Sequence, residues 1–152
     1  MADSSGRAIV EQFTRAMQAK DFEAQGALLS DDYVEEMPQS GERIRGKANW
    51  LAVVTNYPGG VGTLDPVSSR VIGADDHWVL TPQFSVLRIE GSGDNYTYTG
   101  SARYGNGETW IMVALVELRN GKIAKTTTYY AAPFEAPAWR APYVERFPTP
   151  TG

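Results

Sequence analysis

The sequence predicts an α+β domain in which helices come first and a long antiparallel sheet comes last. Apolar residues recur at helical spacing through the first third of the chain, and after Gly62 the period changes to two. The segment Pro58-Gly59-Gly60 separates the two patterns. We expect a strongly curved, mostly antiparallel sheet to wrap around about three helices, which gives a cone with a cavity between the two layers.

Three helices and one short strand are expected before residue 62. Ser4 and Ser5 can cap the first helix. Residues 33–37 are expected to form the strand, followed by a turn-rich segment with a tight hairpin at Ser40-Gly41. The apolar stripes of the three helices are, in order, Ile9, Val10, Phe13, Ala16 and Met17; Phe22, Leu28 and Leu29; and Trp50, Leu51, Val53 and Val54.

The part with a period of two predicts four strands, over residues 65–73, 77–90, 108–118 and 122–131. Asn120-Gly121 is a strong hairpin signal between the last two. The stretch 91–107 has two interpretations. Tyr96 and Tyr98 could extend a strand, whereas the glycines of this stretch favour a loop.

The end of the chain has a different composition. Five of the nine prolines follow Ala132, so this segment cannot be a regular helix or a central strand. It also carries four aromatic residues, which make it too apolar for a free tail: Phe134, Trp139, Tyr143 and Phe147. We therefore expect one cone-shaped domain over residues 1–132. A Pro-rich arm over residues 133–152 is expected to pack on the domain or on a second subunit.

Composition excludes several classes of function. The chain has 152 residues, 42% apolar and 21% charged, which is typical of one globular domain. The net charge of −4 makes nucleic acid and anionic membranes unexpected partners. Cysteine is absent and His77 is the single histidine, so we expect no disulfide, metal or cofactor. No stretch approaches the roughly 20 apolar residues of a membrane span, and the N-terminus does not look like a signal peptide, so we expect a cytoplasmic protein.

The segment most informative about possible catalysis is residues 33–50, YVEEMPQSGERIRGKANW. Glu35 and Glu36 are adjacent, and neighbouring side chains of a strand point to opposite faces. One glutamate should therefore face solvent and the other should face whatever the strand covers. A carboxylate in an apolar pocket has a raised pKa and can shuttle protons.

The order helix-helix-strand-helix followed by strands resembles the nuclear transport factor 2-like fold, most closely its SnoaL-like branch. The segments that carry the resemblance are AIVEQFTRAMQAKDFEAQGALLSDDYV, SGERIRGKANW and ELRNGKIAKTTTYY. The superfamily includes ketosteroid isomerases, polyketide cyclases, limonene epoxide hydrolase and non-catalytic binding or accessory proteins. The resemblance therefore implies the fold and a homodimer, but it does not decide the chemistry.

One position is similar to ketosteroid isomerases, which carry a VED-Pro run whose aspartate is the proton-shuttling base. The run from Val34 to Pro38 puts Glu36 at that position. The two oxyanion donors of those enzymes fall on Phe13 and near Leu115, so ketosteroid isomerisation itself is not expected. The aspartate that many SnoaL-like chains carry after the final tyrosine pair is Ala131 here, and the Asp-Arg-Asp arrangement of epoxide hydrolases is not visible.

We therefore expect Glu36 to be the acid/base group and Glu35 to face solvent. The alternative for Glu36 is a hydrated carboxylate or one paired with Arg43 or Arg45. Arg70 and Tyr130 are the candidates to polarise a substrate oxygen, although an outward Arg70 would be a sheet-surface charge. The expected pocket-lining residues, whose default role is core packing or strand formation, are Phe13, Trp50, Tyr57, Trp110, Met112 and Thr128.

The sequence leaves open whether the protein is an enzyme. One hypothesis is a cofactor-free isomerase, cyclase, lyase or hydratase acting on a small apolar polyketide-, terpene- or steroid-like molecule, with Glu36 moving a proton. A second hypothesis is a non-catalytic binder of a hydrophobic small molecule. A third is an accessory dimerisation module whose pocket is filled by its own side chains. In each case we expect a homodimer formed through the sheet.

Overall fold

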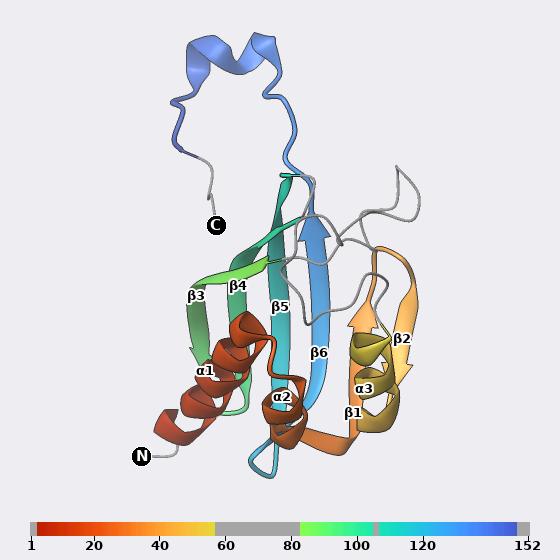
Figure 1. The fold of residues 1–152 in the computed structure, drawn as a ribbon. Helices are drawn as coiled ribbons and strands as arrows, with labels where there is room; N and C mark the ends of the chain where they lie inside the picture. Colours follow the sequence, from red (N-terminus) through yellow and green to blue (C-terminus); the bar gives the residue numbers. More distant parts are fainter. Residues whose placement is uncertain (1–2, 57–82, 105–106, 149–152) are drawn as a thin grey trace.

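The computed structural model describes residues 3–56, 83–104 and 107–148. Within these ranges, three α-helices lie on one face of a six-stranded sheet (Figure 1). The expected strand at 65–73 lies outside the described residues, and so do Tyr57, Arg70 and His77. No helix in the described ranges has the length and apolar character needed to cross a membrane.

The helices are α1 (Asp3–Ala19), α2 (Phe22–Leu28) and α3 (Lys47–Thr55). The predicted stripe of α1 packs into the core: Phe13 is only 4% exposed, and of the five residues only Ile9 is partly rather than fully buried. Lys20 ends α1 in the left-handed conformation, with φ at 57°. Its N–H donates to the Met17 carbonyl, and the next N–H donates to the Ala16 carbonyl, which is the Schellman arrangement. Asp21 then caps α2 by accepting from the Ala24 N–H at 2.9 Å.

The strands are β1 (Leu29–Met37), β2 (Glu42–Arg45), β3 (Gln83–Ser92), β4 (Asn95–Arg103), β5 (Thr109–Arg119) and β6 (Lys122–Ala131). Their order in the sheet is β2-β1-β6-β5-β4-β3. Only the β1–β6 pair is parallel among the described pairings. The predicted α+β architecture with a mostly antiparallel, curved sheet is therefore confirmed.

Glycine allows the close approach of β3 and β4. A Cβ on Gly100 would lie 2.4 Å from the Ser85 carbonyl oxygen, so no larger residue fits there without movement of the backbone. The pairing of these strands shifts register between Val86 and Arg88, directly after the Gly100 pair. Such a bulge bends a strand and increases its twist. The stretch 91–107, which the sequence left undecided, mostly forms β4.

The helices cover one face of the sheet, where the main core lies. Met112, Ala114 and Val116 of β5 point to this face and are at most 1% exposed. Ile111 and Leu115, of the other parity, are 39% and 43% exposed on the outer face. Among the described residues, the core thus lies on one side of the sheet.

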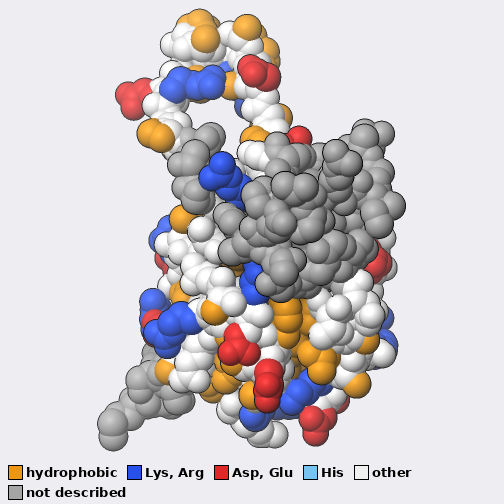
Figure 2. All heavy atoms as spheres, in the orientation of Figure 1, with side chains coloured by type: hydrophobic (Ala, Val, Ile, Leu, Met, Phe, Trp, Pro, Cys, Tyr) orange, Lys and Arg blue, Asp and Glu red, His pale blue; other side chains and the backbone are white. Residues whose placement is uncertain are grey.

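The C-terminal arm extends beyond the end of β6 and contains the 3-10 helix Ala138–Tyr143 (Figures 1 and 2). Its aromatic side chains are exposed, including Trp139 at 72% and Phe147 at 80%. The Arg140 guanidinium stacks 5.5 Å above the Trp139 ring. The arm therefore presents an apolar surface to its surroundings.

Candidate functional site

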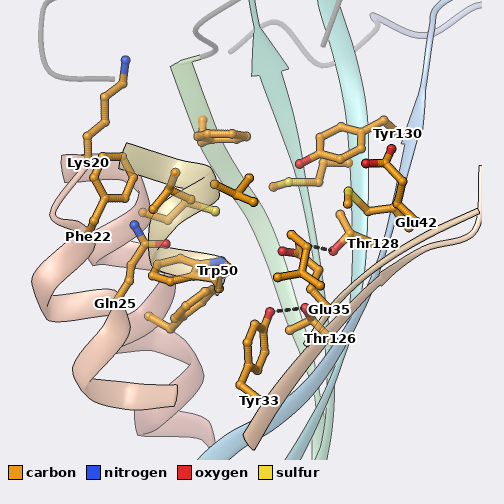
Figure 3. Close-up of a pocket in the computed structure, with 18 of the residues that line it drawn as sticks. Lys20, Phe22, Gln25, Tyr33, Glu35, Glu42, Trp50, Thr126, Thr128 and Tyr130 are labelled. Carbon is orange, nitrogen blue, oxygen red and sulfur yellow. Dashed lines mark hydrogen bonds between the residues drawn. The ribbon is translucent and has the colours of Figure 1, made fainter. Parts of the chain in front are cut away.

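A cavity of about 460 Å³ lies between the helices and the sheet. This volume is within the usual range for sites that bind small molecules. Figure 3 shows its two sides: α2 and the junction before it contribute Lys20, Phe22 and Gln25, and the strands contribute Glu35, Thr128 and Tyr130. Most of the lining is apolar or aromatic, so a ligand there would lose its contact with water.

Glu35 lines this cavity, contrary to the expectation that it faces solvent. The alternation along β1 is as predicted, but the parity is reversed, because Tyr33, Glu35 and Met37 all point to the cavity side. The neighbours of Glu35 in the sheet are Ile44 on β2 and Thr126 on β6, and both also line the cavity.

Burial raises the pKa of the Glu35 carboxyl group to about 7. The Thr128 hydroxyl lies 3.4 Å from Glu35 Oε1 and can donate a hydrogen bond to it, which opposes this rise in part. Near neutral pH the carboxyl group is therefore divided between its acid and carboxylate forms. This is the protonation behaviour that a general acid or base needs.

Glu36 lies on the opposite side of β1 and does not line the cavity, so the expectation that it faces the pocket is wrong. Its Oε1 accepts from Arg43 Nε at 2.9 Å, and its Oε2 lies 3.2 Å from Lys125 Nζ. Hydrogen bonds from Lys125 and Arg43 lower the pKa of Glu36 below its ordinary value. The pairing with Arg43 is the alternative that the sequence left open.

Tyrosines surround the carboxyl group of Glu35. The Tyr33 hydroxyl shares a short hydrogen bond with the buried Thr126 hydroxyl. Burial and the nearby Glu35 charge raise the pKa of both Tyr33 and Tyr98, so both remain neutral hydroxyl groups. The Tyr130 hydroxyl points into the cavity (Figure 3). Tyr98 was not among the site residues expected from the sequence, because its segment had two interpretations.

Most of the other candidate site residues expected from the sequence also line the cavity. Phe13, Trp50, Met112 and Thr128 all line the cavity. Trp110 does not: its ring packs edge-on against Tyr104, 6.1 Å between centroids, and its Nε1 donates to Glu108 Oε2. Trp110 has the same parity as Met112 but lies two residues nearer the start of β5, where Tyr104 lines the cavity instead. Tyr57 and Arg70 lie outside the described residues.

Within the described ranges, no group of three or more His, Cys, Asp or Glu residues is arranged to hold a metal ion. Among the described residues that line the cavity, the charged groups are the carboxylates of Glu35 and Glu42 and the amine of Lys20. The chemistry that these groups can perform directly is proton transfer and hydrogen bonding.

The family follows from comparison with known proteins. A family model described as a SnoaL-like domain matches residues 10–126. The chain belongs to this family. A search of curated proteins gave no match.

Solved structures agree with this membership. An NTF-2 like protein of unknown function from Burkholderia xenovorans is 32% identical, with a TM-score of 0.75, and the match covers 95% of this chain and 97% of that one. A putative ketosteroid isomerase from Kribbella flavida is 24% identical, with a TM-score of 0.76 and coverage of 97% and 93%. An LEH-like epoxide hydrolase from M. tuberculosis is 21% identical, with a TM-score of 0.59 and coverage of 86% and 85%. The last two likenesses show the shared fold.

Proposed function

We propose that this SnoaL-like protein is a cofactor-free enzyme that moves a proton on a small apolar carbonyl compound, with Glu35 as the acid/base group. The proposal rests on one observation above all. A carboxyl group with a pKa of about 7 lines an apolar cavity of small-molecule size. Strongly shifted pKa values in a cavity are typical of functional sites.

The chemistry needs only this chain's own side chains. The Glu35 carboxylate takes a proton from the carbon next to the substrate carbonyl, which leaves an enolate and a neutral Glu35. The Tyr130 hydroxyl donates a hydrogen bond to the carbonyl oxygen as negative charge develops there. Glu35 then returns its proton to the same or another carbon of the substrate. An isomerisation results when the proton returns to a different carbon.

A non-catalytic binder is the second candidate, and a specific observation favours it. By the resemblance to ketosteroid isomerases, the two oxyanion donors fall on Phe13, which packs in the core, and near Leu115, which lies on the outer face of the sheet. Catalysis therefore depends on Tyr130 or Tyr98 to provide the donor. If neither hydroxyl reaches the oxygen, the cavity binds its ligand without turnover.

Deuterium exchange separates the two candidates. The probe is 1-indanone, a small apolar ketone, in D₂O, with incorporation next to the carbonyl followed by NMR. We expect the wild type to accelerate exchange with a pH midpoint near 7, because the carboxylate form of Glu35 is the base. Glu35→Gln should lower the enzymatic rate by about 100-fold or more.

Glu36→Gln is the matched control for this experiment. It removes a carboxylate one residue away that does not line the cavity, so the exchange rate should stay close to that of the wild type. Equal exchange rates in the wild type and Glu35→Gln would refute the enzymatic proposal. Retained binding of the ketone in both proteins would then favour the binder.

We also propose that the protein works as a homodimer formed through the outer face of the sheet, in the cytoplasm. Four large apolar side chains support this interface, and they are 39–52% exposed in the single chain: Leu87, Ile111, Leu115 and Tyr129. The exposed aromatic arm would pack on the second subunit. The lack of cysteine is compatible with a reducing compartment.

A further inference from the structure

The helix side of the cavity carries two polar groups that the proton-transfer chemistry does not use. Gln25 on α2 is only 3% exposed, lines the cavity, and its Nε2 has no hydrogen-bond partner among the described residues. Lys20, at the junction of α1 and α2, also lines the cavity, and its buried Nζ likewise lacks a partner there. A buried donor without an acceptor destabilises a folded protein, so it needs an explanation.

Lys20 also lowers the stability of the fold through its backbone conformation. It occupies the left-handed position that ends α1, with φ at 57°, where glycine is the usual residue. Burial also lowers the pKa of its ammonium group. A glycine would remove both the strain and the buried amine, so the structure keeps lysine here at a cost in stability. Strain of this kind is often found at functional sites.

The charges around the cavity indicate which ligand group would satisfy these donors. The carboxylates among the described lining residues, Glu35 and Glu42, both lie on the strand side (Figure 3). Lys20 is the cation among the described lining residues, and it lies on the helix side with Gln25. A negatively charged ligand group would be repelled from the strand side and attracted to the helix side.

We propose that Gln25 binds, and the charge of Lys20 attracts, the carboxylate of an apolar carboxylic acid whose body fills the cavity toward Glu35. Gln25 donates its amide N–H to a carboxylate oxygen. Lys20, whose side chain runs away from Gln25 in Figure 3, supplies a positive charge on the same side of the cavity. This assignment rests on the proposed function and narrows it: the natural substrate is an apolar oxo acid, with its carboxylate at the α1–α2 junction and its ketone facing Glu35.

Calorimetric titration with two probes of the same shape tests this site. The probes are 1-naphthylacetate, which carries a carboxylate, and 1-naphthylacetamide, which is neutral. We expect the wild type to bind the carboxylate more tightly. Lys20→Gly should weaken binding of 1-naphthylacetate about tenfold and change binding of the amide less than about twofold. Lys20→Arg, which keeps the charge, should retain most of the preference.

Gln25→Met should weaken binding of both probes, because both present an oxygen to the Gln25 amide. Both Gln25→Met and Lys20→Gly should also raise the melting temperature of the unliganded protein, since they remove an unpaired buried group. A purely structural role would instead lower it. Equal affinities of the wild type for the two probes, no binding of either, or unchanged affinities in both variants would overturn the carboxylate site.

The test of the carboxylate site can fail or succeed independently of the test of proton transfer by Glu35. Proton exchange on 1-indanone, which has no carboxylate, reports on Glu35 chemistry in the wild type. Exchange without a preference for 1-naphthylacetate would overturn the carboxylate site and leave the proton-transfer proposal intact. A preference for 1-naphthylacetate without exchange would support the site and refute the proton-transfer proposal.

Discussion

Glu35→Gln should change how the stability of the protein depends on pH. The folded state raises the pKa of Glu35 from its ordinary value of 4.5 to about 7. Below pH 4.5 the carboxyl group is protonated in both the folded and the unfolded chain and contributes no difference. Between pH 4.5 and about 7 the unfolded chain loses this proton first, so the free energy of unfolding falls as pH rises. Above pH 7 the loss is complete.

The size of the effect follows from the two pKa values. At about 1.4 kcal/mol for each pH unit, the rise corresponds to a loss of about 3 kcal/mol in the wild type between pH 4.5 and pH 8. Glutamine is neutral throughout, so Glu35→Gln should lack this loss. Urea unfolding followed by tryptophan fluorescence at several pH values would measure the difference between the two proteins.

Glu36→Gln should show the opposite sign. Lys125 and Arg43 lower the pKa of Glu36, so this residue stabilises the fold above its ordinary pKa and loses that contribution as pH falls. The variant should therefore be less stable than the wild type at neutral pH, and the gap should close in acid. If the Glu35→Gln and wild-type stabilities stayed parallel across pH, or if both variants shifted in the same direction, the assignment of the two carboxylates would be wrong.

Three further changes test the fold around the cavity and the proposed homodimer. Gly100→Ala should lower the melting temperature by about 5 °C, because its Cβ would meet the Ser85 carbonyl oxygen at 2.4 Å; an unchanged value would contradict the close approach of β3 and β4. Tyr33→Phe should cost about 1–2 kcal/mol in denaturant unfolding by leaving the Thr126 hydroxyl unpaired, and adding Thr126→Val should recover part of it. Deleting residues 133–152 should weaken the proposed homodimer in analytical ultracentrifugation, and an unaffected dimer would remove the arm from the interface.

The sequence was sufficient for the fold because each local signal agreed with the others. The stripe of α1, the Asn120-Gly121 turn and the alternation of the last two strands appear in the structure. The other two stripes differ from the prediction, because Leu29 begins β1 and because Leu51 and Val53 of α3 are 40% and 47% exposed. The interpretation was undecided at residues 91–107, where glycines argued for a loop. Gly100 sits inside β4 because the neighbouring backbone comes too close for a side chain. From sequence, a glycine in a strand and a glycine in a loop look alike.

The site was harder to predict, because side chains alternate along β1 and a shift of one residue exchanges the glutamate that faces the cavity with the one that faces away from it. The resemblance to the VED-Pro run favoured Glu36, and Tyr33 gave the contrary signal. An aromatic residue two positions before Glu35 places that parity on the core side, and Tyr33 is 1% exposed. The Arg43 and Lys125 partners of Glu36 come from β2 and β6, so they become visible only when the strands are paired.

The two glutamates also explain why a cavity is needed for the proposed chemistry. Both are glutamates on the same strand, yet the pKa of Glu35 is raised and the pKa of Glu36 is lowered. The difference comes from the two faces of β1: on one face arginine and lysine neutralise the charge, and on the other the cavity removes it from water. Filling the cavity with larger core residues would stabilise the fold but leave no room for a substrate beside Glu35. A destabilising carboxyl group beside open volume is therefore better explained by function than by folding.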